Sequence, residues 1–287
     1  MKKIEFTKMH SLGNDFIVLD CTKKNLQVSK KFIKNLASRN YGVGCDQVLL
    51  IKKLKNNSFD YEIYNQDGSK SGQCINGAKC VVKYIAEKYH LANKAISLIT
   101  KTIEMKAISS RDSKGIKISF PYKEISDLET VKKTGFTKNK KSITVNDKSY
   151  SFELAYVGNP HCIIFAKNIA KININAIAET INKKQIFSNG INLTLAQVDS
   201  KSKIQIRTFE RGTGETLSCG SAAISTALVS FKLGKTFSRM NIYSLGGYNT
   251  VMINPQNIDL IGSANKVFEG IYICLLYTSD AADDWSC

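Results

Sequence analysis

The chain has few of the residues that build metal centres, rigid turns or membrane segments. It contains three histidines, three prolines and one tryptophan in 287 residues, and its cysteines include no CxxC pair. With so few ligands at metal-binding spacing, we expect no metal site. No run of about 18 apolar residues is present, as a transmembrane helix needs, and residues 1–6 lack the apolar segment of a signal peptide. We therefore expect a soluble, cytoplasmic protein with no membrane partner.

Arginine is also scarce, although the chain is strongly basic. The net charge is +17, but only five of the 41 basic residues are arginine, and the lysines are spread along the whole length. Proteins that read nucleic acid usually gather arginine and lysine on one face. The charge therefore predicts a solvated lysine coat, and we expect no nucleic-acid partner.

The chain has eight cysteines, and without an export signal they argue against a disulfide framework. We expect reduced thiols. Apolar residues make up 43% of the chain, which is enough for a core in one large or two ordinary domains. A polar segment at residues 121–142, with lysine, threonine and glycine, is the predicted connection between two domains.

The stretch from Thr208 to Leu228 carries the clearest chemical pattern. A polar loop with an acid, Glu210, and a base, Arg211, leads to Cys219, and small residues then open an apolar segment of helical length. This order predicts a thiol at a helix N-terminus. The helix dipole and the unpaired backbone N–H groups there lower the pKa of a thiol and can bind a carboxylate.

The first half of the chain repeats this layout around Cys74. Both Cys74 and Cys219 follow a strand-like segment and a polar loop with glycine, and both precede small residues and an apolar helix. The two cysteines are separated by about half of the chain. The repeat predicts two duplicated domains, each presenting a thiol at the start of a helix.

A pair of thiols suits one kind of chemistry. Inverting a carbon stereocentre needs a base on one face and an acid on the other, and a thiolate and a thiol can exchange these roles when the reaction runs backward. The α-proton of an amino acid is weakly acidic, so the carbanion must be stabilised. Two helix N-termini aimed at the carboxylate would supply fixed dipoles. This scheme requires no cofactor.

Several further blocks of sequence occur in an order that is more specific than any single motif. They are Lys8–Phe16, Asn65–Gly68 with Cys74–Ala78, Gly158–His161, Gly190–Asn192, Glu210–Ser221 and Val267–Gly270. At these residues the chain resembles the diaminopimelate epimerase family. The resemblance implies an α+β fold of two pseudo-symmetric domains, each a curved mixed β-sheet or barrel wrapped around a central α-helix, with the active site in the cleft between them.

The resemblance also implies domain boundaries. The N-terminal domain would comprise residues 1–120 plus 264–272, and the C-terminal domain residues 121–263. Residues 273–287 lie past the usual end of the family and hold the only tryptophan. We expect these last residues to be a non-native tail.

The activity implied by the resemblance is the interconversion of LL- and meso-diaminopimelate, in lysine and peptidoglycan precursor synthesis, with Cys74 and Cys219 as the acid/base pair. Each further role is carried over by position. The reacting carboxylate would be held by backbone N–H groups at Ile75, Asn76, Gly220 and Ser221, and the reacting end would be bordered by Asn14 and Gln47. The distal carboxylate would be bound by Asn65, Asn159, Asn192 and Arg211. Glu210 would face the amino groups, and His161 would be an orienting group.

The distal assignment also makes chemical sense by itself. A substrate with an amino acid at both ends needs a second site for a zwitterion, and the planar guanidinium of Arg211 matches a carboxylate. We therefore expect this small-molecule substrate and no cofactor. A homodimer is the assembly that we expect an experiment to test.

One departure from the family pattern keeps alternatives open. The family usually has glycine where this chain has Ile75, and a branched Cβ restricts the backbone and crowds a carboxylate. One alternative is a proline or hydroxyproline racemase, which shares the architecture and the cysteine pair. Another is a catalytically inactive, basic binding homologue on the same fold.

Overall fold

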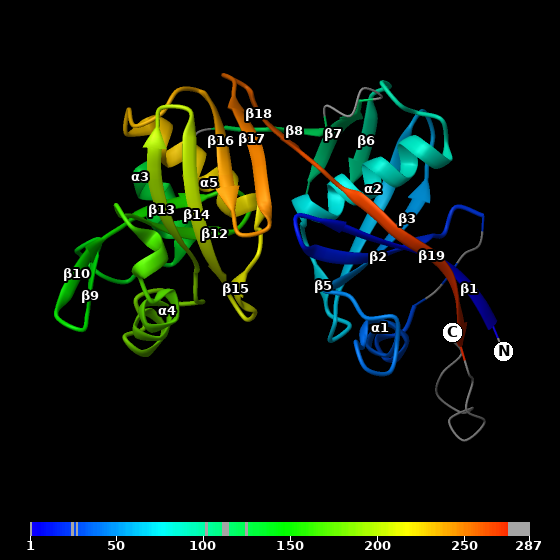
Figure 1. Ribbon diagram of the computed structural model, residues 1–287, viewed down its shortest axis with the longest axis horizontal. Coiled ribbons are helices and arrows are strands. Elements are labelled where there is room, and N and C mark those ends of the chain that lie inside the picture. The colour runs from blue at the N-terminus through cyan, green and yellow to red at the C-terminus, as the bar shows by residue number, and fades with distance from the viewer. Residues whose placement is uncertain are drawn as a thin grey trace. The chain divides into compact units, whose positions relative to one another are not determined.

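The computed structural model describes residues 2–23, 26, 28–100, 103–110, 115–123 and 126–274. The chain divides into two compact units, Met1–Ile118 with Ser263–Cys287, and Ser119–Gly262. We call them unit 1 and unit 2 (Figure 1). Of the expected tail, Ile273 and Cys274 end a strand, and the remainder lies outside the described residues.

Unit 1 is a mixed sheet with two helices. Strand β2 pairs antiparallel with β1 and parallel with β3, β3 pairs antiparallel with β4, and β4 pairs parallel with β6, which is antiparallel to β7. The last strand, β19, returns to pair antiparallel with β1. Its elements are β1 (Lys2–Ser11), β2 (Asn14–Asp20), α1 (Lys30–Ala37), β3 (Gln47–Lys53), β4 (Ser58–Asn65), β5 (Lys70–Ser71), α2 (Ile75–Lys88), β6 (Ile96–Ile99), β7 (Glu104–Ser109) and β19 (Asn265–Cys274), and β8 (Ile116–Pro121) leads out of the unit.

Unit 2 repeats this order of pairings. Strand β12 pairs antiparallel with β11 and parallel with β13, β13 pairs antiparallel with β14, and β14 pairs parallel with β16, which is antiparallel to β17. Its elements are α3 (Asp127–Thr134), β9 (Ser142–Val145), β10 (Lys148–Ser151), β11 (Glu153–Tyr156), β12 (Pro160–Phe165), η1 (Ile169–Lys171), α4 (Ile174–Lys183), β13 (Asn192–Ser200), β14 (Lys203–Glu210), β15 (Gly214–Thr216), α5 (Gly220–Lys232), β16 (Arg239–Ser244), β17 (Gly247–Ile253) and β18 (Asn257–Gly262).

One helix in each unit lies against several strands of its own sheet (Figure 1). Helix α2 contacts β1, β2, β3 and β7, and α5 contacts β11, β12, β13, β16 and β17. Both helices are buried along most of their length, and the buried positions of α5 are mainly alanine, serine and threonine. Small side chains let a helix approach the surrounding strands closely, and a helix buried on all sides is expected at the centre of a core. The fold is therefore α+β, with a central helix in each unit.

The expected connection at residues 121–142 is wrong in part, because it contains helix α3. The Ser126 side chain caps this helix by accepting from the N–H of Glu129, and Gly135 ends it in the left-handed conformation. Asp127 and Glu129 also lie in the first turn, where negative charge complements the helix dipole. These local signals outweigh the polar composition that suggested an irregular connection.

No helix in the described part of the chain combines the length and the apolarity that a membrane-spanning helix needs.

Candidate functional site

Cys74 is the N-cap residue of α2, as predicted. Its Sγ accepts a hydrogen bond from the backbone N–H of Gly77 at 3.4 Å, and the side chain is half-buried. The hydroxyl of Tyr61 donates to the Cys74 carbonyl at 3.1 Å. A Cβ at Gly77 would lie 2.5 Å from that hydroxyl, so glycine is required for the close approach. Tyr61, which sequence reasoning missed, therefore holds the loop that ends at Cys74.

Cys219 is the N-cap residue of α5, in the position that corresponds to Cys74. It is 7% exposed, and its Sγ lies 3.4 Å from the Oγ of Ser221. Burial, and then the Glu210 carboxylate, raise the pKa of the Cys219 thiol, while hydrogen bonds from Ser221 and from the Ala222 backbone act in the opposite direction. The surroundings therefore favour the neutral thiol at Cys219, so the lowered thiol pKa expected at this helix start is outweighed by burial.

A polar network connects Cys219 to His161. The Nε2 of His161 lies 3.0 Å from the Oδ1 of Asn159 and 3.1 Å from the Oγ of Ser221, and Asn159 Nδ2 donates to the same Oγ at 3.3 Å. Burial lowers the pKa of His161 to about 3, so the imidazole is neutral at physiological pH. A neutral ring with its proton on Nε2 donates to Asn159, which leaves the Ser221 hydroxyl free to donate to the Cys219 sulfur. The network thus links His161 to the Cys219 sulfur through the Ser221 hydroxyl.

In unit 1, the amide side chains of two residues expected at the reacting end, Asn14 and Gln47, each pair with the amide of another expected site residue. Asn76 Nδ2 donates to Asn14 Oδ1 at 3.4 Å, and Gln47 Nε2 donates to Asn65 Oδ1 at 2.9 Å. Gln47 begins β3 and Asn65 ends β4, and the two residues are register partners in the sheet. Ile75, the first residue of α2, is 4% exposed.

Asp15 and Asp46, which adjoin Asn14 and Gln47 in the chain, belong to a charged cluster that sequence reasoning missed. The N–H of Asp15 donates to the Asp46 carboxylate and the N–H of Asp46 donates to the Asp15 carboxylate, at 3.1 and 3.0 Å. Arg39 bridges both carboxylates at 2.7 Å, and Lys8 pairs with Asp15. Burial would raise the pKa of Asp15, but Arg39 and Lys8 lower it to about 2. The signal was available, because Asp15 follows Asn14 and Asp46 precedes Gln47.

In unit 2, Asn192 and Arg211, expected at the distal carboxylate, and Glu210, expected at the amino groups, lie around one turn. Asn192 begins β13, its Oδ1 accepts from the backbone N–H of Arg211 at 3.0 Å, and its Nδ2 donates to the Pro160 carbonyl at 3.1 Å. Glu210 ends β14, and its carboxylate accepts from the Thr216 hydroxyl at 2.7 Å. Asn192 and Glu210 therefore occupy the places in unit 2 that Gln47 and Asn65 occupy in unit 1.

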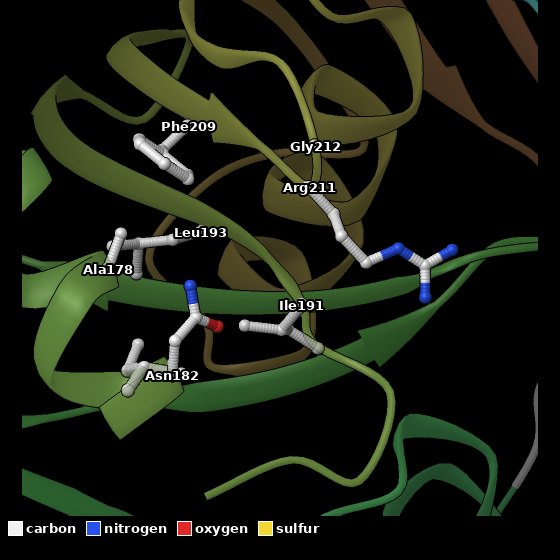
Figure 2. Close-up of a pocket in the computed structure, with 8 residues that line it drawn as sticks. Ala178, Asn182, Ile191, Leu193, Phe209, Arg211 and Gly212 are labelled. Atoms are coloured by element: carbon white, nitrogen blue, oxygen red, sulfur yellow. The ribbon is translucent and has the colours of Figure 1, made fainter. Parts of the chain in front are cut away.

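The Arg211 guanidinium points away from the apolar side chains beside its loop (Figure 2). Its Nη1 donates to the Asn189 carbonyl at 2.8 Å. Those apolar side chains, which include Leu193 and Phe209, line a cavity of about 40 Å³. A cavity of this size has room for a few water molecules at most. Arg211 is itself one of the residues that line this cavity, but it is exposed and its guanidinium end extends away from the cavity (Figure 2).

Within the described ranges, no three histidine, cysteine, aspartate or glutamate side chains gather in a group that could hold a metal ion.

Comparison with known proteins places these features in a family. Residues 6–117 and 154–267 match the family model for diaminopimelate epimerase. The chain belongs to the diaminopimelate epimerase family. It is 34% identical to the diaminopimelate epimerase of Buchnera aphidicola subsp. Acyrthosiphon pisum, over 95% of this chain and 97% of that protein. It is 32% identical to the Coxiella burnetii diaminopimelate epimerase, over 94% of this chain and 99% of that protein.

A solved structure from outside this set of relatives has the same fold. A probable proline racemase from Agrobacterium radiobacter aligns with a TM-score of 0.66 at 15% identity, covering 96% of this chain and 94% of that chain. This likeness is one of fold alone. The family membership identifies the chain as an enzyme of the isomerase class, an epimerase.

Proposed function

We propose that the chain interconverts LL- and meso-diaminopimelate by proton transfer between Cys74 and Cys219, without a cofactor. One observation carries the proposal. In a member of an epimerase family, two topologically equivalent units each present a cysteine as the N-cap of their central helix. Identical side chains in equivalent positions suit a reaction whose acid and base exchange roles with direction.

The two helix starts supply the electrostatics. N–H groups in the first turn of any helix lack acceptors within the helix, and the dipole places positive partial charge there. The first turns contain Ile75 and Asn76 in α2, and Gly220 and Ser221 in α5. Held around the reacting carboxylate, these groups would stabilise the negative charge that develops when the α-proton leaves.

The remaining residues would recognise the rest of the substrate. Asn14 and Gln47 border the reacting end in this proposal, and the distal carboxylate is bound by Arg211 with amides from three further residues. Those amides belong to Asn65, Asn159 and Asn192. Glu210 would face an ammonium group, since its carboxylate lies near the Cys219 thiol and is already oriented by Thr216.

The proposal also includes a reducing cellular location. The seven cysteines in the described residues form no disulfide with one another, and both proposed acid/base groups must stay reduced to act. We place the enzyme in the cytoplasm on this ground. The homodimer stays a prediction.

Exchange of solvent deuterium into the substrate α-carbon tests the function directly. The reduced enzyme should label LL-diaminopimelate and produce the meso isomer in the same time course. Exchange into proline, with none into diaminopimelate, would favour the racemase alternative. Binding of diaminopimelate by calorimetry with no exchange into either compound would identify an inactive binding homologue.

Mild oxidation gives a second, independent measurement. Two thiols that reach one carbon from opposite faces should become linked when oxidised, and activity should fall in parallel. Mass spectrometry of the digested, unreduced protein would detect the Cys74–Cys219 pair. Full activity after both thiols have been lost to oxidant would contradict the two-thiol mechanism.

A further inference from the structure

Arg207 uses its guanidinium for four hydrogen bonds to other groups of the protein. It lies in β14 and forms a two-pronged ion pair with Glu215 of β15, with Nε to Oε1 at 2.6 Å and Nη2 to Oε2 at 2.9 Å. The two side chains are only 18% and 22% exposed. A paired, partly buried fork of this kind is stronger and more directional than an ion pair on the open surface.

The third nitrogen of the same guanidinium reaches another part of the chain. Nη1 of Arg207 donates to the carbonyl of Ile169 at 2.7 Å and to the carbonyl of Ile172 at 2.8 Å. Both carbonyls belong to the short turn η1 and its end, just before α4 begins. One planar group therefore joins β14, β15 and η1. Lysine, a point charge with three rotatable donors, cannot copy this arrangement.

The segment held in this way carries the main groups of the proposed site in unit 2. Glu215 lies four residues after Arg211 and four residues before Cys219. The intervening turn is the tip of a hairpin, closed by the antiparallel pairing of β14 with β15 and by the N–H of Thr213, which donates to the Glu210 carbonyl. The tip itself is open to its surroundings, because neither Gly212 nor Gly214, both with positive φ, would meet a neighbouring atom if it carried a Cβ. Side-chain contacts add to this backbone pairing and set how the hairpin sits on the rest of unit 2.

Two of those contacts belong to the site itself. Thr216 donates to Glu210, and the N–H of Arg211 donates to Asn192. The Arg207–Glu215 pair is a third contact, and four of the five N–H donors of Arg207 are already taken by Glu215 and by two carbonyls. Its contribution is therefore indirect.

We propose that Arg207 is a positioning residue, which acts through Glu215 to hold the 208–219 loop so that Arg211 and Cys219 keep their places relative to one another within unit 2. This inference rests on the proposed function of Arg211 in carboxylate binding. Arg207 itself contacts no substrate.

The first test separates positioning from a loss of folded protein. Arg207→Lys should raise the KM for diaminopimelate and lower kcat, reducing kcat/KM roughly tenfold to a hundredfold, because a displacement of about 1 Å in a site is enough for such losses. A smaller folded fraction would lower the apparent kcat but leave KM unchanged. Arg239→Lys, at an exposed arginine of β16, is the matched control and should keep both constants.

The second test asks whether the two charges act as a unit. Glu215→Gln should change the constants in the same direction as Arg207→Lys, and the double variant should be no worse than the more damaged single variant. Additive losses, or an unchanged KM in both single variants, would overturn the proposal.

A third measurement does not depend on activity. In the Arg207→Lys variant, backbone amides of residues 208–218 should exchange with deuterium faster than in the wild type, while those of β13 and α5 stay the same. Unchanged exchange in the loop would overturn the proposal even if the wild type failed to act on diaminopimelate. Faster loop exchange together with an inactive wild type would instead count against the proposed function alone.

Discussion

The loops that end at Cys74 and Cys219 have the same place in two repeated folds but different surroundings. Cys74 is half-buried, and the N–H of Gly77 points at its sulfur. Cys219 is almost fully buried, and its sulfur faces the Ser221 hydroxyl, with burial and Glu210 raising its pKa. The repeated fold thus gives both thiols the same position at a helix start, while the groups that contact the two sulfur atoms differ.

The residues after the two cysteines differ as well. Ile75 follows Cys74, whereas Gly220 follows Cys219, and both are buried at the first position of a helix. Isoleucine adds apolar contacts that glycine lacks, but it also restricts the backbone at a helix start that is proposed to bind a carboxylate. The first helix start therefore has more apolar packing and less backbone freedom than the second.

The largest expected effect comes from removing either thiol. Cys74→Ala and Cys219→Ala should each lower the rate of epimerisation by about 10³-fold or more, because each loses an essential acid or base. Isomer interconversion can be followed by chiral chromatography, with Cys162→Ala in the core of unit 2 as the control. Substantial epimerisation by either of the two variants would show that the equivalence of Cys74 and Cys219 is structural only.

The next effect concerns Ile75. Ile75→Ala should lower the free energy of unfolding by about 3 kcal/mol, as expected for truncating a buried isoleucine. Urea denaturation followed by circular dichroism would measure it. The position in unit 2 that corresponds to Ile75 is Gly220, where Gly220→Ala makes the opposite change by adding a side chain. If Ile75→Ala leaves the stability of the protein unchanged, packing does not explain isoleucine at this position.

A smaller effect is expected from the polar network of unit 2. Ser221→Ala removes a hydrogen bond that lowers the pKa of Cys219, so the thiolate should form only at higher pH and alkylation of Cys219 near neutrality should slow by roughly tenfold. Alkylation of Cys74 should keep its rate, which makes it the internal control. Peptide mass spectrometry after timed treatment with iodoacetamide gives both rates. Equal slowing at both thiols would contradict a local effect of Ser221.

The smallest effect is expected in the charged cluster of unit 1. Arg39 and Lys8 hold the pKa of Asp15 at about 2, below its ordinary value of 3.8. The ion pairs therefore stabilise the fold above about pH 4, and this contribution is lost as the pH falls toward 2. Arg39→Gln should cost about 1 kcal/mol at pH 7, since Arg39 is largely exposed.

The control for Arg39→Gln is the same stability measurement repeated at lower pH. Denaturation curves of wild type and variant should differ at pH 7 and converge as the pH falls from about 4 to about 2, because protonated Asp15 no longer needs a cation. A difference that persists at the lowest pH would mean that Arg39 acts through packing of its side chain and not through the carboxylates.

Short-range pattern was enough to predict the two helix starts. Cysteine followed by small residues and an apolar periodic segment places the helix boundary correctly at both Cys74 and Cys219. The same kind of local reasoning was wrong at residues 121–142, where the capping residue Ser126 and the left-handed Gly135 define a helix that the polar composition concealed.

Contacts between distant residues could not be predicted in this way. Arg207 is an ordinary strand residue by pattern, and only the tertiary structure brings the carbonyls of Ile169 and Ile172 to its guanidinium. Similarly, Asp15 and Asp46 lie in separate segments until the parallel pairing of β2 with β3 joins them.

The sequence by itself determined the family, the repeat of one unit and the presence of a cysteine at each helix start, because these depend on residue types at short spacing. Only the tertiary structure decided how the two thiols differ. Burial, the Ser221 hydroxyl and the neutral ring of His161 act through distances in space, and the chain places Ser221 and His161 60 residues apart. A charge or a proton responds to what surrounds it, and folding sets those surroundings.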